Sequence, residues 1–91
     1  MAQSLPRIRM PIDPFQILDK LSPILPQALL GKEIVALDYD KEADVLYVSF
    51  VPKPFAVDSE PIDERGIVIA GLNQAEEIVR ITILNASSFL Y

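Results

Sequence analysis

Four acidic side chains recur at every second position between residues 38 and 44, and runs of oxygen ligands are what calcium prefers. They are Asp38, Asp40, Glu42 and Asp44. A sensor-type calcium loop that starts at Asp40 needs Gly at its sixth position and Glu at its twelfth, where this chain has Val45 and Val51. We therefore predict no such loop, and expect Asp40 and Asp44 to bond the backbone of a turn while Glu42 is solvated. A looser divalent-cation site stays open as an alternative.

A second acidic run contains carboxylates that could pair as general acid and base. It comprises Asp58, Glu60, Asp63 and Glu64. A small domain offers little cleft in which burial could shift the pKa of a carboxylate, so a solvated, proline-containing connector is the favoured interpretation.

Three hydroxyls are candidate nucleophiles if a lysine activates them. The serines are Ser59, Ser87 and Ser88, and the lysines are Lys20, Lys32, Lys41 and Lys53. Their spacing matches no nucleophile motif, so we predict turn and cap hydroxyls. Asn85-Ala86-Ser87 matches the sequon for N-glycosylation. We interpret it in the same way as the serines, as a helix cap. We therefore assign no catalytic, cofactor-binding or metal-binding residue and no cofactor, and we predict that the chain is not an enzyme.

The composition excludes further classes of function. The chain has 91 residues, 51% of them hydrophobic, and contains no Cys and no His, which removes thiolate nucleophiles, imidazole bases and the usual zinc sites. Its net charge is −5, and no basic cluster favours nucleic acid. Residues 1–32 carry four basic and two acidic residues (net +2), and the remainder carries four basic and eleven acidic residues (net −7). No apolar run is long enough to span a membrane, and prolines interrupt any signal peptide, so we expect a cytoplasmic protein.

The elements expected along the chain begin with helices. Asp13 as cap, Pro14 at the first helical position and Gln16 in a capping box predict a helix over 14–21. A second short turn is expected over 26–30, ended by Gly31. An apolar stripe on this arm is expected to dock on a sheet face: Phe15, Leu18, Leu21, Leu25 and Leu29.

From Glu33 the hydrophobic period becomes two, which predicts strands. Residues 33–51 are expected to form a hairpin turning at 40–44, with Tyr39 and Tyr47 as cross-strand neighbours. Its core-facing side chains would be Leu46, Val48 and Phe50. Apolar strands are expected at 67–70 and 78–84, and Pro61 excludes a central strand between them and the hairpin.

The predicted fold class is α+β. Short N-terminal helices pack on a four-stranded antiparallel β-meander, which ends in a short C-terminal turn at 85–88. Residues 1–32 would form a helical arm and residues 33–91 the sheet domain.

Within residues 38–88 the chain resembles the small prokaryotic family called domain of unknown function 2283. The resemblance rests on Tyr39 to Val48, Asp58-Ser59-Glu60, Gly66 to Ile69, Glu77-Ile78-Val79 and Ile83-Leu84-Asn85-Ala86-Ser87. It implies a compact antiparallel sheet. Family members resemble proteins encoded beside small toxin-like proteins, which implies an antitoxin-like role. The family has an Asp and a Gly around the last turn, where this chain has Asn73 and Ala75-Glu76. We therefore expect the conformation of this turn to differ from that of the family.

The leading functional hypothesis is a non-enzymatic protein-interaction module that forms a homo-oligomer, and a dimer is the favoured state. A protein encoded nearby is the expected partner. The alternative is a domain that binds a small ligand or a divalent cation through the acidic hairpin. A third hypothesis is a minimal enzyme that uses carboxylates alone. Neither nucleic acid nor a membrane is an expected partner.

Overall fold

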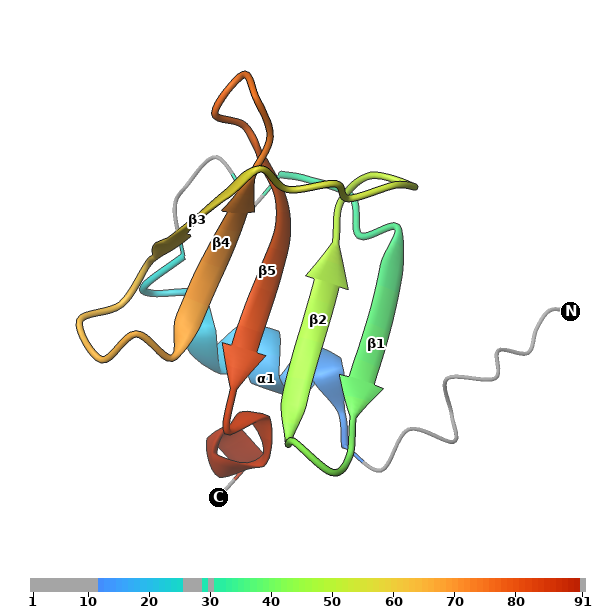
Figure 1. Ribbon diagram of the computed structural model, residues 1–91. Helices are drawn as coiled ribbons and strands as arrows, with labels where there is room; N and C mark the ends of the chain where they lie inside the picture. Colours follow the sequence, from blue (N-terminus) through green and yellow to red (C-terminus); the bar gives the residue numbers. More distant parts are fainter. Residues whose placement is uncertain (1–11, 26–28, 30, 91) are drawn as a thin grey trace, which may run out of the picture.

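The computed structural model describes residues 12–25, 29 and 31–90 and shows a helix packed on one face of an antiparallel sheet (Figure 1). None of the helices in these residues is long and apolar enough to cross a membrane. The elements are α1 (Pro14–Leu21), β1 (Ala36–Asp40), β2 (Val45–Ser49), β3 (Asp58–Pro61), β4 (Val68–Leu72), β5 (Ile78–Leu84) and the 3₁₀ helix η2 (Ala86–Leu90).

The predicted four-stranded meander is wrong in both strand number and strand order. The sheet has five strands in the order β1-β2-β5-β4-β3, and every neighbouring pair is antiparallel. The chain leaves the β1–β2 hairpin, crosses to the far edge as β3, and returns through β4 to β5 at the centre. The strand that was not predicted is β3, which carries acidic residues and Pro61. Such residues are rare inside a sheet, but an edge strand tolerates them.

Helix α1 has the predicted bounds. Asp13 Oδ1 accepts hydrogen bonds from the backbone N–H of Phe15 (3.1 Å) and of Gln16 (3.3 Å), and Pro14 occupies the first turn. These contacts satisfy the free donors of the helix start. The second helical turn expected over 26–30 lies outside the described residues, apart from Leu29.

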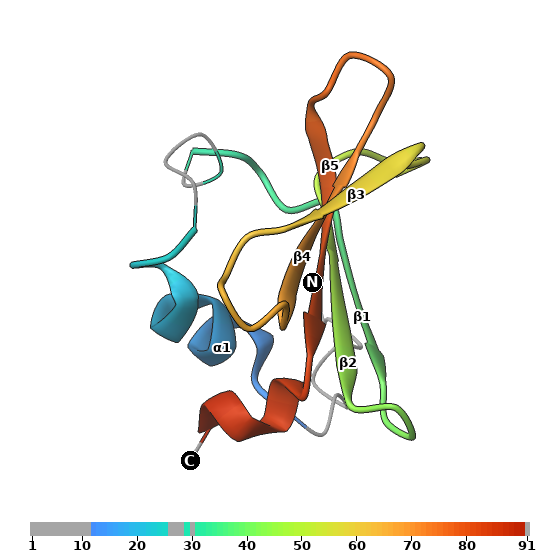
Figure 2. The same cartoon turned by 60° about the vertical axis from the view of Figure 1, so that its left-hand side comes forward.

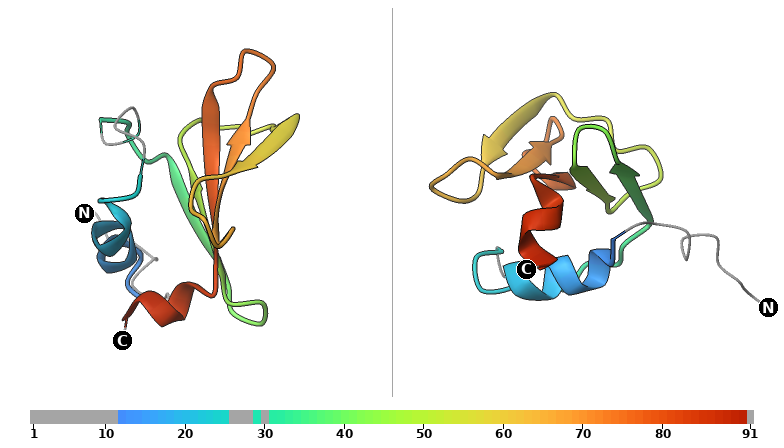
Figure 3. Two further views of the ribbon diagram at one scale, coloured as in Figure 1. Left: turned by 90° about the vertical axis from the view of Figure 1, so that its left-hand side faces the viewer. Right: turned by 90° about the horizontal axis from the view of Figure 1, so that it is seen from below.

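The core lies between α1, η2 and one face of the sheet (Figures 2 and 3). Leu46 and Val48 face it from β2, as predicted, and Phe50 packs against it with partial burial. The buried cluster comprises Ile17, Leu21, Leu29, Leu46, Val48, Val68, Ile81, Ile83 and Ala86. The helix therefore shares one core with the sheet.

The cross-strand pairing of the two tyrosines is also wrong. Tyr39 stands opposite Leu46, whereas Tyr47 stands opposite Asp38. Because successive strand residues point to opposite faces, Tyr39 lies on the core face and Tyr47 on the other. A register that differs by one residue from the expected register reverses the face of every side chain.

Candidate functional site

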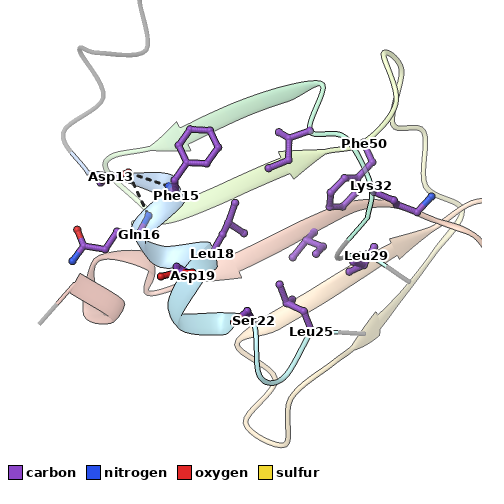
Figure 4. A pocket seen from close by; sticks show the side chains of 12 residues that line it. Asp13, Phe15, Gln16, Leu18, Asp19, Ser22, Leu25, Leu29, Lys32 and Phe50 are labelled. Carbon is purple, nitrogen blue, oxygen red and sulfur yellow. Dashed lines mark hydrogen bonds between the residues drawn. The ribbon is translucent and has the colours of Figure 1, made fainter. Parts of the chain in front are cut away.

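A groove opens between α1, the segment that leads into β1, and the core face of the sheet (Figure 4). Its volume is about 670 Å³, within the range of small-molecule and peptide-anchor sites. The lining residues are Asp13, Phe15, Gln16, Leu18, Asp19, Ser22, Leu25, Leu29, Lys32, Ile34, Phe50 and Ile81.

The groove exists because the sheet and η2 cover only part of the surface of α1. Ile17 and Leu21 are 0% and 2% exposed and fix the helix on the sheet. Phe15 and Leu18 stand on the side that faces the groove, and Phe15 is 54% exposed. Of the predicted docking stripe, Leu21 and Leu29 are buried and Leu18 and Leu25 partly buried, while Phe15 stays exposed. The fully buried anchor of the helix is Ile17, which the predicted stripe omitted.

Polar groups edge the groove rather than fill it. Asp13, Gln16 and Asp19 lie along α1, and Lys32 lies at the far end beside Phe50 (Figure 4). The apolar floor would bury an apolar group, and the carboxylates along the helix would favour a cationic group beside it. This combination of an apolar floor and a charged edge suits the binding of an amphipathic group.

A second cluster joins the β1–β2 hairpin to the C-terminal helix. The Asp44 carboxylate accepts hydrogen bonds from the Tyr39 hydroxyl (2.6 Å), the Ser87 hydroxyl (2.7 Å) and the Ser87 backbone N–H (3.0 Å). The backbone carbonyl of Asp44 also accepts from Ala86 N–H (3.0 Å). Hydrogen bonds from Tyr39 and then from Ser87 hold the pKa of the Asp44 carboxyl below its usual value.

This cluster corrects two predictions. Asp44 does not bond its own turn but caps η2 by accepting from Ser87, 43 residues away. The carboxylate that caps η2 is therefore that of Asp44. Asn85, at φ 52°, supplies the left-handed turn before η2, and its backbone carbonyl accepts from Ser88 N–H (3.0 Å) and from the Ser88 hydroxyl (2.7 Å). The Ser87 hydroxyl donates to the Asp44 carboxylate (2.7 Å) and not to a lysine, and this contact ties η2 to the hairpin.

The other acidic residues serve the backbone locally. Asp40 Oδ1 accepts from Glu42 N–H and Ala43 N–H, both at 3.1 Å, as predicted for this turn. Asp63 Oδ1 accepts from Ile67 N–H (2.8 Å) and Val68 N–H (3.0 Å), and the bond from Val68 is the largest cause of a lowered Asp63 pKa. Among the residues that the structure describes, no group of three or more acidic side chains is placed to hold a metal ion.

Comparison with known proteins yields one match. The family model described as "Protein of unknown function (DUF2283)" matches residues 36–87, more than half of the chain, and confirms the resemblance seen in the sequence. The matched range covers the whole sheet and the start of η2, and excludes α1 and most of the groove. No curated protein and no solved structure matches the chain.

Proposed function

Because the chain belongs to this family of unknown function, its activity has to be inferred from its own surfaces, and we propose that it is a non-enzymatic protein-interaction module. Its docking surface is the groove beside α1. The observation that supports this proposal is an open apolar groove edged by Asp13 and Asp19 on a chain of net charge −5. The partner that fits is a protein segment with an apolar face and basic flanks.

The proposal extends to self-association and cellular role. A 51% hydrophobic composition and several large apolar side chains that are about half exposed or more favour a homo-oligomer. Binding a basic protein encoded nearby would make the chain antitoxin-like. In this proposal the chain acts in the cytoplasm.

Two exposed phenylalanines allow a matched test of the groove. Phe15 lines it, whereas Phe55, which is 79% exposed, lies on the crossover between β2 and β3. The probe is a 14-residue amphipathic helix of Leu and Lys, titrated into the isotopically labelled full chain and followed by amide NMR shifts. We expect shifts around α1, Ile34 and Phe50, and at least a ten-fold loss of affinity in Phe15→Asp.

Phe55→Asp is the control and should bind like the parent. The proposal fails if both variants bind equally, or if the shifts spread over the acidic loops without reaching the groove, because charge alone would then explain the binding.

The size of the groove supports a second candidate, a small amphipathic ligand. In a thermal-shift series of saturated fatty acids, a rise in melting temperature that Leu18→Asp abolishes would favour this ligand over a protein segment.

A further inference from the structure

The groove beside α1 carries opposite charges at its two ends. Asp13 and Asp19 lie along the helix, and Lys32 lies at the far end beside Phe50 (Figure 4). Lys32 is the only cationic side chain among the described residues that line the groove. Because the helix side holds two carboxylates and the far end holds an ammonium group, the groove has a direction as well as a shape.

The side chains of Asp19 and Lys32 are available to an incoming segment. Both residues are exposed, and in the described part of the chain neither side chain makes a hydrogen bond or an ion pair. Asp13 differs, because its Oδ1 already accepts from the N–H groups of Phe15 and Gln16 at the start of α1. Asp19 is therefore the carboxylate that can meet a cation without weakening the helix cap.

The middle of the groove is apolar. Figure 4 shows leucine side chains between Asp19 and Lys32 in this view. The apolar lining comprises Leu29 and Ile81, which are 5% and 0% exposed, and the partly buried Leu18, Leu25 and Ile34. A charge placed over these side chains would lose its hydration without gaining a partner. A bound segment therefore sets apolar side chains over the middle and keeps its charged residues for the two ends.

The two ends of the groove select opposite charges. The side along α1 attracts a basic residue and repels a carboxylate, whereas Lys32 does the reverse. A segment with one basic end and one acidic end gains two attractive contacts in one orientation and meets two repulsive contacts when it is reversed. A segment with two basic ends keeps the contact along α1 and meets repulsion at Lys32.

We propose that the groove binds its protein segment in one direction, with a basic residue along α1 and an acidic residue beside Lys32. This inference rests on the proposed function, in which the groove holds a protein segment, and it adds the residue that determines orientation. Lys32 is that specificity-determining residue. The partner segment is basic at one end, apolar in the middle and acidic at the other end.

The test compares two 14-residue amphipathic helices with Leu along one face and Lys at one end, whose other end carries Glu or Lys. Each is titrated calorimetrically into the full chain, and the ratio of the two affinities is compared between variants, which cancels differences in the helicity of the free peptides. Lys32→Glu should shift this ratio about three-fold or more towards the peptide with two Lys ends, as expected for one exposed ion pair that is lost and reversed. Lys53→Glu makes the same change in net charge at an exposed position outside the groove lining and should leave the ratio unchanged.

A spin label on the peptide reports the direction of binding. It is attached through a cysteine at one end or the other of the peptide with one Glu end, and the chain itself has no Cys that could exchange with it. We expect the label at the Lys end to broaden the amide signals of Phe15 and Gln16, and the label at the Glu end to broaden those of Ile34 and Phe50.

The possible failures are distinguishable. Binding in the groove with equal broadening from both labels, or with a ratio of affinities that Lys32→Glu leaves unchanged, overturns the single direction while the proposed function stands. An equal shift of the ratio in Lys53→Glu also overturns it, because net charge alone would then explain the preference. Peptides that leave the signals of α1, Ile34 and Phe50 unchanged overturn both the direction and the proposed function.

Discussion

Asp44 offers the sharpest test of how this fold is held together. Replacing it with Ala removes three hydrogen bonds, from Tyr39 and Ser87. At a half-buried site each contributes roughly 0.5–1 kcal/mol, or about 2 kcal/mol in total. Asp44 also sits at φ 58°, where Ala costs about 1 kcal/mol more. We expect Asp44→Ala to lower the free energy of unfolding by about 3 kcal/mol, and Asp44→Asn, which tolerates this φ and keeps one acceptor, by about 1 kcal/mol.

The assay is urea unfolding of the parent and both variants at pH 7 and near pH 3. Because the folded pKa of Asp44 is lowered, its charge-dependent stabilisation is complete above the unfolded pKa of roughly 4 and is lost as the pH falls through the folded value. The gap between the parent and Asp44→Asn should therefore shrink at the lower pH.

Glu42→Gln is the matched control, since Glu42 is exposed in the same turn. The reasoning is refuted if Asp44→Ala unfolds at the same urea concentration as Glu42→Gln. A gap between the parent and Asp44→Asn that is equal at both pH values would show that the carboxylate charge contributes nothing.

Three further substitutions test the core and one turn. Val48→Asp places a carboxylate at a position that is 0% exposed and should cost at least ~3 kcal/mol, so a melting temperature within a degree or two of the parent would contradict its inward facing. Ile17→Ala, also at 0% exposure, should cost about 2–4 kcal/mol in urea unfolding, and a loss below about 1 kcal/mol would show that α1 is not part of the core. Glu76→Gly should raise the free energy of unfolding by roughly 0.5 kcal/mol, because Glu76 holds φ 63°; a decrease would refute the strain.

The features predicted correctly from sequence are those encoded locally. The neighbouring residues Asp13 and Pro14 define the start of α1, and the alternation of apolar side chains defines β2 and β5. The order of the sheet was missed because β5 inserts between β2 and β4 through contacts that span more than thirty residues. The Asp44–Ser87 cap was not predicted for the same reason. Its hydrogen bond joins residues that are 43 positions apart, and no periodic pattern in the sequence indicates such a contact. The groove was missed because it depends on which side of α1 the sheet leaves open.

The strand order has a consequence for biosynthesis. In the sheet, β5 lies between the β1–β2 hairpin and the β3–β4 pair, and it is the last of the five strands to appear in the sequence. A nascent chain that stops before residue 78 holds two separate hairpins, each marginal alone. The sheet therefore closes only after β5 has been synthesised, and chains truncated before it would expose unpaired apolar strands to chaperones and proteases.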